Sequence, residues 1–400
     1  MDTNRAAGRS RLAQRGFGLV ELMVGLVIGL IAVLVIFQVY TVGEGFKRNT
    51  TAAGDAQMNG LFSTFVLGME IGNGGAGMAV AAQDLASCLD PGGAMPQRFA
   101  QSFRPIPVMV TDGGGNSKPD SFVVNYSMAT TLASSATFAA DADPTESYFV
   151  QSPGGFHNGD LIVAIASPNT PNSPCGSSVV TAVSSPPDVN GNVTITHTGS
   201  AFSYFSGASR LLNMGPANRA QKILYKVCDQ RAGCPQPPIC NLVTANGLQS
   251  HCTLDSTPLL DANGQPLANP VGNPLASNIV NMKVEYGIDS DLDAKGLVDT
   301  WVQATNGWEP GTLLDPATGT VVKINQIKAM RIGLIVQSEQ FDQTLGDYNW
   351  VLFDCANANK ALCPGRLTGT IAASATPPGN WRFRKYETII PLRNEIWNKS

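Results

Sequence analysis

The chain has 400 residues and a formal net charge of −4, and 14% of its residues are charged. This balance gives no basic footprint for nucleic acid, so direct DNA or RNA binding has no support in the composition. The 41 glycines and 26 prolines exceed the usual share and favour a body of strands and loops. The length allows either one elaborated domain or two lobes.

The first 16 residues hold four arginines and one acid, and an almost wholly apolar segment follows them. Residues 22–37 are uninterruptedly apolar, and with residues 17–20 they approach the roughly 20 residues that a helix needs to cross a bilayer. A basic segment stays on the cytoplasmic side of the membrane. The small-residue cleavage site that a secretory signal carries beyond its apolar core is not recognisable here. We therefore predict a single-pass helix with a cytoplasmic amino terminus.

The helix is expected to continue beyond Tyr40 and to become amphipathic, so that it covers residues 17–70. Apolar residues recur there near helical spacing and predict a stripe that faces a folded domain. This stripe consists of Met58, Leu61, Phe62, Phe65, Val66 and Met69. Glycine costs a helix interior roughly 0.8 to 1 kcal/mol relative to alanine, so local melting is expected near four glycines. These are Gly43, Gly45, Gly54 and Gly60.

Glu21 is the one acid of the apolar segment. A carboxylate in hydrocarbon costs about 2.5 kcal/mol or more, so it is normally excluded or given a partner. A cut between Gly16 and Phe17 would create an amino group one helical turn from Glu21. This amino group would be the partner, in the same chain or in a neighbouring subunit.

The stretch RGFGLVELMVGLVIGL, residues 15–30, resembles the class III signal of type IV prepilins and pseudopilins. In that signal a basic leader ends in Gly, and Glu stands five positions into the mature chain. The resemblance implies that a prepilin peptidase cuts after Gly16, which makes residues 1–16 a leader, and methylates the amino group of Phe17. It also implies that the apolar helix holds the subunit in the inner membrane until the subunit enters a filament, where Glu21 neutralises an adjacent amino terminus.

All eight cysteines follow the apolar helix, on the exported side, where disulfides persist. They are Cys88, Cys175, Cys228, Cys234, Cys240, Cys252, Cys355 and Cys363. The favoured pairing joins Cys355 to Cys363, places two local bridges among the middle four and leaves Cys88 for Cys175, but eight cysteines allow many other pairings. Zinc is disfavoured, because the middle four contain no C-x-x-C pair and only His251 lies nearby.

Alternating apolar, β-branched and aromatic residues predict strands in the rest of the chain. They are expected at residues 121–127, 147–150, 160–166, 192–197, 222–227, 278–288, 329–338 and 386–392. Turn-rich segments are expected at residues 71–78, 111–120, 166–178 and 233–277. The last of these is long for a compact domain, so we expect cysteines to fasten part of it.

The order of the late segments resembles the carboxyl-terminal pattern of the PilW family of minor pilins, relatives of the J-type minor pseudopilin of type II secretion. A strand ends in Tyr-Gly-hydrophobic-Asp, an aspartate-rich loop follows, the next strand carries an arginine, and the last strand ends in Leu-Arg-Asn. The matching residues are Tyr286, Gly287, Asp289, Arg331, Leu392, Arg393 and Asn394. The resemblance implies an α+β, pilin-like fold, with a long amino-terminal helix packed on an antiparallel sheet. Residues 71–400 would form an enlarged, loop-rich, disulfide-bonded domain.

The loop of residues 289–300 has its own candidate chemistry. Asp289, Asp291 and Asp293 alternate and Asp299 follows, which supplies hard oxygen ligands of the kind that calcium requires. The loop departs from the EF-hand rule at the turn glycine and at the bidentate glutamate, and a solvated acidic hairpin loop is the alternative.

An anchored periplasmic hydrolase is the competing class, but no H-E-x-x-H, G-x-S-x-G or P-loop motif occurs. His157, His197 and His251 stand in expected loops or strand ends, as bystanders do. A half-cystine is the expected role of Cys175, next to its serines. We predict that the chain is not an enzyme.

The family resemblance implies a minor pilin that primes filament growth and sits at the pilus tip, supporting twitching motility and adhesion. Its implied partners are other minor pilins, the major pilin, the prepilin peptidase, the inner-membrane assembly platform, a tip adhesin and membrane lipid. Its expected location is the inner membrane before assembly, then the periplasm and the filament tip. Two alternatives stay open: a J-type minor pseudopilin, and a single-span membrane-anchored binding protein.

Overall fold

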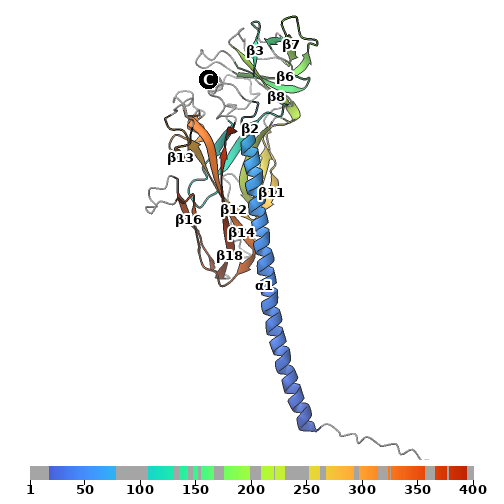
Figure 1. Cartoon of the computed structure of the whole chain (residues 1–400), viewed down its shortest axis with the longest axis vertical. Coiled ribbons are helices and arrows are strands. Elements are labelled where there is room, and N and C mark those ends of the chain that lie inside the picture. The colour runs from blue at the N-terminus through green and yellow to red at the C-terminus, as the bar shows by residue number, and fades with distance from the viewer. Residues whose placement is uncertain are drawn as a thin grey trace, which may run out of the picture. The chain divides into compact units, whose positions relative to one another are not determined.

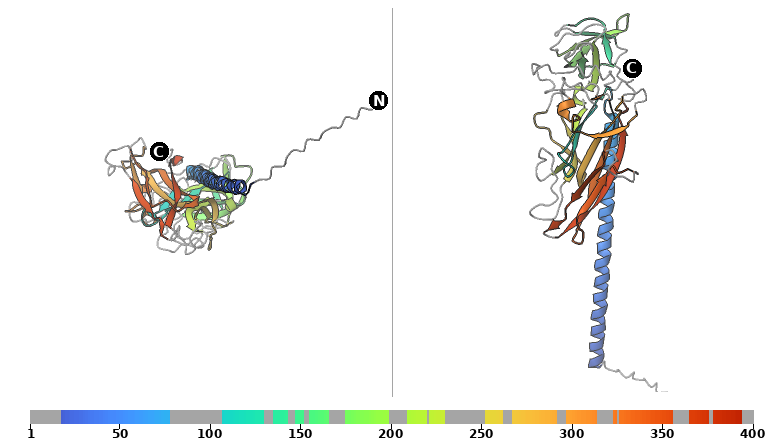
Figure 2. Two further views of the ribbon diagram at one scale, coloured as in Figure 1. Left: turned by 90° about the horizontal axis from the view of Figure 1, so that it is seen from below. Right: turned by 90° about the vertical axis from the view of Figure 1, so that its left-hand side faces the viewer.

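A computed structural model describes the following parts of the chain: residues 18–77, 107–129, 135–142, 147–151, 155–165, 175–198, 209–219, 221–229, 252–261, 267–291, 297–313, 323–324, 326–355, 365–375 and 378–393. The chain divides into two compact units, Met1–Ala52 and Ala53–Ser400, and each is described by itself. Figures 1 and 2 show one long helix and several antiparallel sheets, so the α+β fold class is confirmed.

The long helix, α1, covers Leu19–Asn73 without a break. It is the one helix among the described residues that is long and apolar enough to cross a membrane. Its large apolar side chains from Leu19 to Val42 are all at least 50% exposed, as suits a segment solvated by lipid. The expected melting at Gly43, Gly45, Gly54 and Gly60 is wrong, because α1 remains helical through all four. Helix propensity is a weak preference that the surrounding helix and tertiary contacts override.

The second half of α1 packs on the folded body through small and aliphatic residues. From residue 53 onward, the buried positions of α1 are Ala56, Gly60, Ser63, Leu67 and Ile71. They recur every three or four residues and therefore lie on one face. A Cβ atom at Gly60 would overlap the ring of Tyr386, so the glycine permits this close approach. The predicted stripe from Met58 to Met69 faces the other way, and the expectation that it contacts the folded domain is wrong.

The body is built from two five-stranded antiparallel sheets. The first has the order β1 (Val108–Thr111), β2 (Ser121–Tyr126), β9 (Gln221–Asp229), β10 (Cys252–Pro258) and β11 (Asn273–Ser277). The second has the order β13 (Thr300–Gln303), β12 (Ile279–Ile288), β14 (Ile327–Asp342), β18 (Pro378–Pro391) and β17 (Ser374–Ala375). Two short helical segments accompany the strands, η1 (Ala217–Arg219) and α3 (Pro310–Leu313).

The two sheets share one hydrophobic core with the end of α1. The chain passes from β11 in the first sheet to β12 in the second at Asn278, whose φ of 64° makes the corner. There the N–H of Asn278 donates to the carbonyl of Cys252, and its carbonyl accepts from the N–H of Gln337, so both sheets are joined. The hydroxyl of Tyr286 on β12 accepts from the N–H of Val110 on β1.

A closed antiparallel barrel is inserted between the paired strands β2 and β9 (Figure 1). Its order is β3 (Ala136–Phe138), β4 (Tyr148–Gln151), β7 (Asn192–His197), β6 (Cys175–Val183), β5 (Asp160–Ile165) and β8 (Arg210–Pro216). The barrel has a hydrophobic cluster of its own, in which the rings of Phe138 and Tyr148 meet edge to face. A closed barrel leaves no unpaired sheet edge, which explains how so small an insertion is stable.

A two-stranded hairpin of β15 (Tyr348–Leu352) and β16 (Leu367–Ile371) packs on the second sheet. The side chain of Leu352 lies over Gly333 of β14, where a larger residue would collide with it.

All eight predicted strands coincide with observed ones. The turn-rich interpretation of residues 233–277 and 166–178 is partly wrong: β10 and β11 lie in the first segment, and β6 begins at Cys175 in the second. The sequence of β10, CTLDSTP, carries little apolar alternation. It is a strand because it pairs with β9 along its whole length, from Cys252 to Pro258.

Candidate assembly surface

Glu21 lies in the first turn of α1, with an exposed side chain. The first N–H groups of a helix lack partners and carry partial positive charge, so this end of α1 favours an anion. Gly16 and Phe17 lie outside the described residues, so the contact between the amino group of Phe17 and Glu21 stays a prediction.

The exposed apolar residues on the second half of α1 form a continuous strip, which we call the α1 stripe. It consists of Met58, Leu61, Phe62, Phe65 and Met69, whose exposed fractions range from 46% to 69%. At 100° per residue, these side chains lie on the helix face opposite Gly60 and Leu67. Contiguous exposed apolar residues mark interaction sites, because water solvates them poorly. The sequence analysis identified these residues as an apolar stripe, but it predicted that the stripe packs on the folded body, whereas the stripe is exposed.

Two side-chain hydrogen bonds to the first sheet hold α1 in its orientation and therefore set the direction of the α1 stripe. The hydroxyl of Tyr126 on β2 donates to Glu70 Oε2 over 2.8 Å. Burial, and then the Glu70 carboxylate, raises the pKa of Tyr126, and the same causes raise the pKa of Tyr225 on β9. Both phenols therefore stay protonated and remain donors at neutral pH. Asn59, one turn before Ser63, adds a bond from its amide to Ser277 Oγ on β11 over 3.2 Å.

The acidic loop brings three of the four predicted calcium ligands together. One carboxylate oxygen from each of Asp289, Asp291 and Asp299 lies within 4.8 Å of the others, while Asp293 lies outside the described residues. Asp289 is buried and the other two side chains are exposed. Three carboxylates offer part of the six to eight oxygens that calcium takes, so the carbonyls of the loop and water would complete the shell.

Hydrogen bonds hold the two ends of this loop together. Asp299 Oδ2 accepts from the N–H of Ser290 over 3.0 Å and from its hydroxyl over 2.7 Å, and these bonds lower the pKa of Asp299. Gln326 Nε2 donates to the carbonyl of Ser290 over 2.9 Å. The loop is therefore closed before β13 begins, and its calcium affinity stays a prediction.

Two buried ion pairs lie on the face of β12 that the loop at residues 113–120 and the β15–β16 hairpin cover. Lys283 Nζ donates to Asp120 Oδ1 over 2.6 Å, and both side chains are less than 5% exposed. Arg331 donates to Glu285 Oε2, with its Nε at 2.7 Å. The Arg331 guanidinium also lies between the rings of Trp301 and Phe353, at 4.7 and 4.4 Å from their centroids. Sequence analysis placed Arg331 in a family pattern but missed its partner. Glu285 lies on another strand, and no fixed spacing along the sequence indicates which residues of two strands pair.

Burial raises the pKa of Glu285 to about 7, although the charge and hydrogen bonds of Arg331 act in the opposite direction. Burial also raises the pKa of Asp120, against Lys283 and the N–H groups of Gly113 and Val284. Glu285 and Arg331 stand directly opposite each other on β12 and β14, whereas Lys283 and Asp120 join β12 to the residue that precedes β2 in the first sheet.

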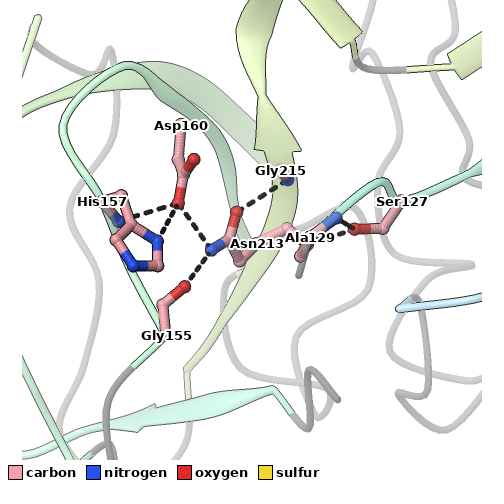
Figure 3. Close-up of polar contacts among 7 residues, drawn as sticks. All are labelled: Ser127, Ala129, Gly155, His157, Asp160, Asn213 and Gly215. Carbon is pink, nitrogen blue, oxygen red and sulfur yellow. Dashed lines mark hydrogen bonds and ion pairs between the residues drawn. The ribbon is translucent and has the colours of Figure 1, made fainter. Parts of the chain in front are cut away.

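The two histidines that the structure describes, His157 and His197, contact neighbouring residues of the barrel. In Figure 3, Asp160 Oδ2 accepts from the N–H of His157 over 2.8 Å and from Asn213 Nδ2 over 2.8 Å. The carbonyl of Asn213 accepts from Ser127 Oγ over 2.9 Å, so this network fastens the barrel to the end of β2. His197 stacks on Tyr148 with centroids 3.8 Å apart, and His251 lies outside the described residues.

The described cysteine side chains, Cys228, Cys252 and Cys355, are not free thiols. Cys228 and Cys252 stand on the paired strands β9 and β10, at the two ends of the segment that holds Cys234 and Cys240. Cys88, Cys234, Cys240 and Cys363 lie outside the described residues, and Cys175 is described by its backbone alone. The predicted connectivity is therefore untested.

Two family patterns match the chain. The prokaryotic N-terminal methylation motif matches residues 11–37, and the Type IV Pilus-assembly protein W (PilW) family matches residues 255–394. The second match covers β12, β14 and β18 together with the acidic loop. Searches of curated proteins and of solved structures returned no match.

Proposed function

We propose that this chain, a PilW-type minor pilin by both of its family matches, primes type IV pilus assembly and sits at or near the filament tip. It would support twitching motility and adhesion through the filament, beneath a tip adhesin. The PilW family is a structural family, and its members work in pilus assembly. The methylation motif with its apolar helix fits a membrane-anchored pilin, which would move from the inner membrane through the periplasm into the filament.

The α1 stripe is the observation that carries this proposal. The side chains of Phe62 and Phe65 are 46% and 68% exposed on a helix that the Tyr126 and Glu70 contact holds in place. A packed aromatic side chain buries about 150–250 Å² of surface. A subunit that acted alone would therefore be more stable if Phe62 and Phe65 were buried, or more soluble if they were replaced by polar residues. A subunit that packs its helix on other pilins needs this surface. The partners that we propose are the other minor pilins and the major pilin, with the prepilin peptidase and the assembly platform acting earlier.

Glu21 would act at the other end of the same helix. In the assembly, its carboxylate would neutralise the methylated amino terminus of an adjacent subunit that begins at Phe17. Where water is excluded, the loss of one partner of an ion pair leaves the other charge uncompensated, which costs free energy. Loss of the carboxylate should therefore affect incorporation more than membrane insertion.

The test measures incorporation into sheared filaments for two variants expressed with the whole assembly system. Glu21→Val should leave the protein in the membrane fraction yet reduce its amount in filaments about tenfold or more. Replacing Phe62 and Phe65 by serine should have the same effect, whereas serine at the exposed Val189 of the barrel is the matched control. Normal incorporation of both variants would contradict the proposed assembly role.

The J-type minor pseudopilin of type II secretion is the second candidate. The match of the PilW family to the last third of the chain supports the pilus instead. A single-span binding protein predicts no processing of the leader. The intact mass after co-expression with a prepilin peptidase separates this binding protein from the two pilin-type candidates, because a pilin or a pseudopilin would lose residues 1–16 and gain a methyl group on Phe17.

Two local features complete the proposal. Calcium would bind at Asp289, Asp291 and Asp299, with Asp293 as a further ligand. Disulfides would join Cys355 to Cys363, form two local bridges among the four central cysteines and pair Cys88 with Cys175. Peptide mapping without reduction tests this connectivity.

A further inference from the structure

The last long strand of the chain has one unpaired side. β18 pairs with β14 from Asn380 with Asp342 to Pro391 with Ala329, with one irregularity between Gln337 and Phe341 and an unbroken register from Phe383 to Pro391. On its other side, β17 pairs only with Pro378 and Gly379. Within the described residues, no strand lies on that side of β18 from Asn380 onward.

Two hydrogen bonds show which backbone groups of β18 point outward. The N–H of Leu392 donates to the carbonyl of Lys328, and the N–H of Arg382 donates to Ser338 Oγ, both toward β14. Backbone groups alternate in direction along an antiparallel strand, so the even-numbered residues face β14. The odd-numbered residues from Phe383 to Ile389 therefore point their N–H and C=O groups away from the sheet. We call this row of outward backbone groups the β18 edge.

The chemistry of the β18 edge fits an added strand. Lys385, Glu387 and Ile389 are exposed residues. Pro391, which has no N–H, stands at the next outward position and ends the row of donors without disturbing the β14 ladder. The seven residues of the edge span about 23 Å at roughly 3.3 Å per residue, which is the length of an ordinary strand partner.

The side chains around the β18 edge define what the partner must carry. Arg384 is exposed, and it forms no ion pair with any residue that the structure describes. Lys385 and Glu387 already pair with each other over 3.1 Å on the opposite face. Ile389 is 62% exposed on that opposite face. A partner strand could therefore contact the Arg384 cation on one face of the sheet and the apolar side chain of Ile389 on the other.

We infer that the β18 edge binds an extended segment of a different protein chain, which adds to the second sheet as a strand. The segment would place an acidic side chain beside Arg384 and an apolar side chain beside Ile389. These two positions are five residues apart, so they lie on opposite faces of the added strand, as its alternation requires.

A second copy of this chain fits the β18 edge less well. Antiparallel pairing of two copies would point their α1 helices in opposite directions, which two chains anchored in one membrane cannot do. Parallel pairing would bring Arg384 and Lys385 of one copy beside the same cations of the other, and neighbouring like charges destabilise a sheet. The inference rests on the proposed function only for this membrane anchoring.

The test uses the full chain in detergent micelles and an acetylated heptapeptide of alternating valine and threonine that carries one glutamate. Hydrogen exchange is read at single amides. Without peptide, the amides of Lys385, Glu387 and Ile389 should exchange rapidly, and those of Tyr386 and Thr388 slowly. Peptide at millimolar concentration should slow the odd-numbered amides about tenfold or more and leave the even-numbered ones unchanged.

Two matched variants isolate the backbone edge. Ile389→Pro removes an outward N–H without touching the β14 ladder and should abolish the protection of Lys385 and Glu387. Ile389→Ala keeps that N–H and should retain protection. Both variants should keep the slow exchange of Thr388, which shows that the sheet is intact.

Four results would overturn the inference. Slow exchange of the odd-numbered amides without peptide would mean that the edge is already covered, and protection that rises with protein concentration would assign it to a second copy. Unchanged peptide protection in Ile389→Pro would remove strand addition. A peptide with lysine in place of glutamate should bind several-fold more weakly, and equal binding would overturn the acidic partner. None of these readouts depends on filament formation, so they stand apart from the test of the assembly role.

Discussion

Replacement of Arg331 by methionine should destabilise the body of the protein strongly and in a pH-dependent manner. The variant removes the cation that faces Glu285, whose side chain is fully buried. Breaking a buried pair by removing one partner costs about 3–5 kcal/mol, because it leaves an uncompensated charge in the interior. Methionine keeps much of the apolar contact with Trp301 and Phe353, so lost packing is a small part of this cost.

The pH dependence follows from the carboxyl group. Burial raises the pKa of Glu285 from 4.5 to about 7 in the folded protein. The stability that this group contributes is therefore full below about pH 4.5 and is lost as the pH rises through 7. Arg331 opposes the shift, so its removal raises the pKa of Glu285 further. The cost of Arg331→Met should accordingly be larger at pH 8 than at pH 5, where Glu285 is protonated in both proteins.

Urea unfolding of the full chain at pH 5 and pH 8, followed by tryptophan fluorescence, measures these differences. Arg382→Met is the matched control: its pair with Asp342 spans 2.9 Å, but the Arg382 side chain is 53% exposed. Exposed pairs contribute less than about 1 kcal/mol. If Arg331→Met cost no more than Arg382→Met, or cost the same at both pH values, this interpretation of the buried pair would be wrong.

Two further substitutions test other contacts. Gly60→Ala should cost about 1–3 kcal/mol in thermal or urea unfolding, because its Cβ would overlap the ring of Tyr386, whereas Gly68→Ala, with open space around it, should be neutral or slightly stabilising; equal effects would argue against the close helix packing. Replacing Asp289 and Asp291 by alanine should lower the melting temperature in calcium but not in chelator, and equal shifts in both conditions would remove the calcium site.

Local patterns in the sequence were sufficient for the elements with strong signals. The apolar run around Leu26 needed no tertiary context, because a membrane-spanning helix satisfies its own backbone groups. Strands such as β5 and β12 carry apolar runs that were recognised. Strands β10 and β13 were missed, since ladder pairing and not their own composition makes them strands. The barrel was missed as a unit because its closure depends on six short strands that meet only in space.

The functional residues divide in the same way. Gly16, Phe17 and Glu21 stand within a few residues of one another, so their spacing alone predicts their chemistry, and all three lie within the match to the N-terminal methylation motif. The three aspartates of the acidic loop were also within reach of a local pattern. The partners of Arg331 and Lys283 were not, because the register of β12 and β14 sets the first pair and the packing of the two sheets sets the second.

The sequence by itself determined that a helix long and apolar enough to cross a membrane, with a methylation motif, precedes a β-rich body, because these features reside in local composition and spacing. It also identified the apolar residues on the second half of α1. Only the tertiary structure decided which face of that helix is buried. Small residues at Ala56, Gly60 and Ser63 let α1 approach the sheets closely, and this turns Phe62 and Phe65 outward. An amphipathic pattern shows which residues of a helix share a face. The shape of the body that the helix packs on decides which of its faces is buried.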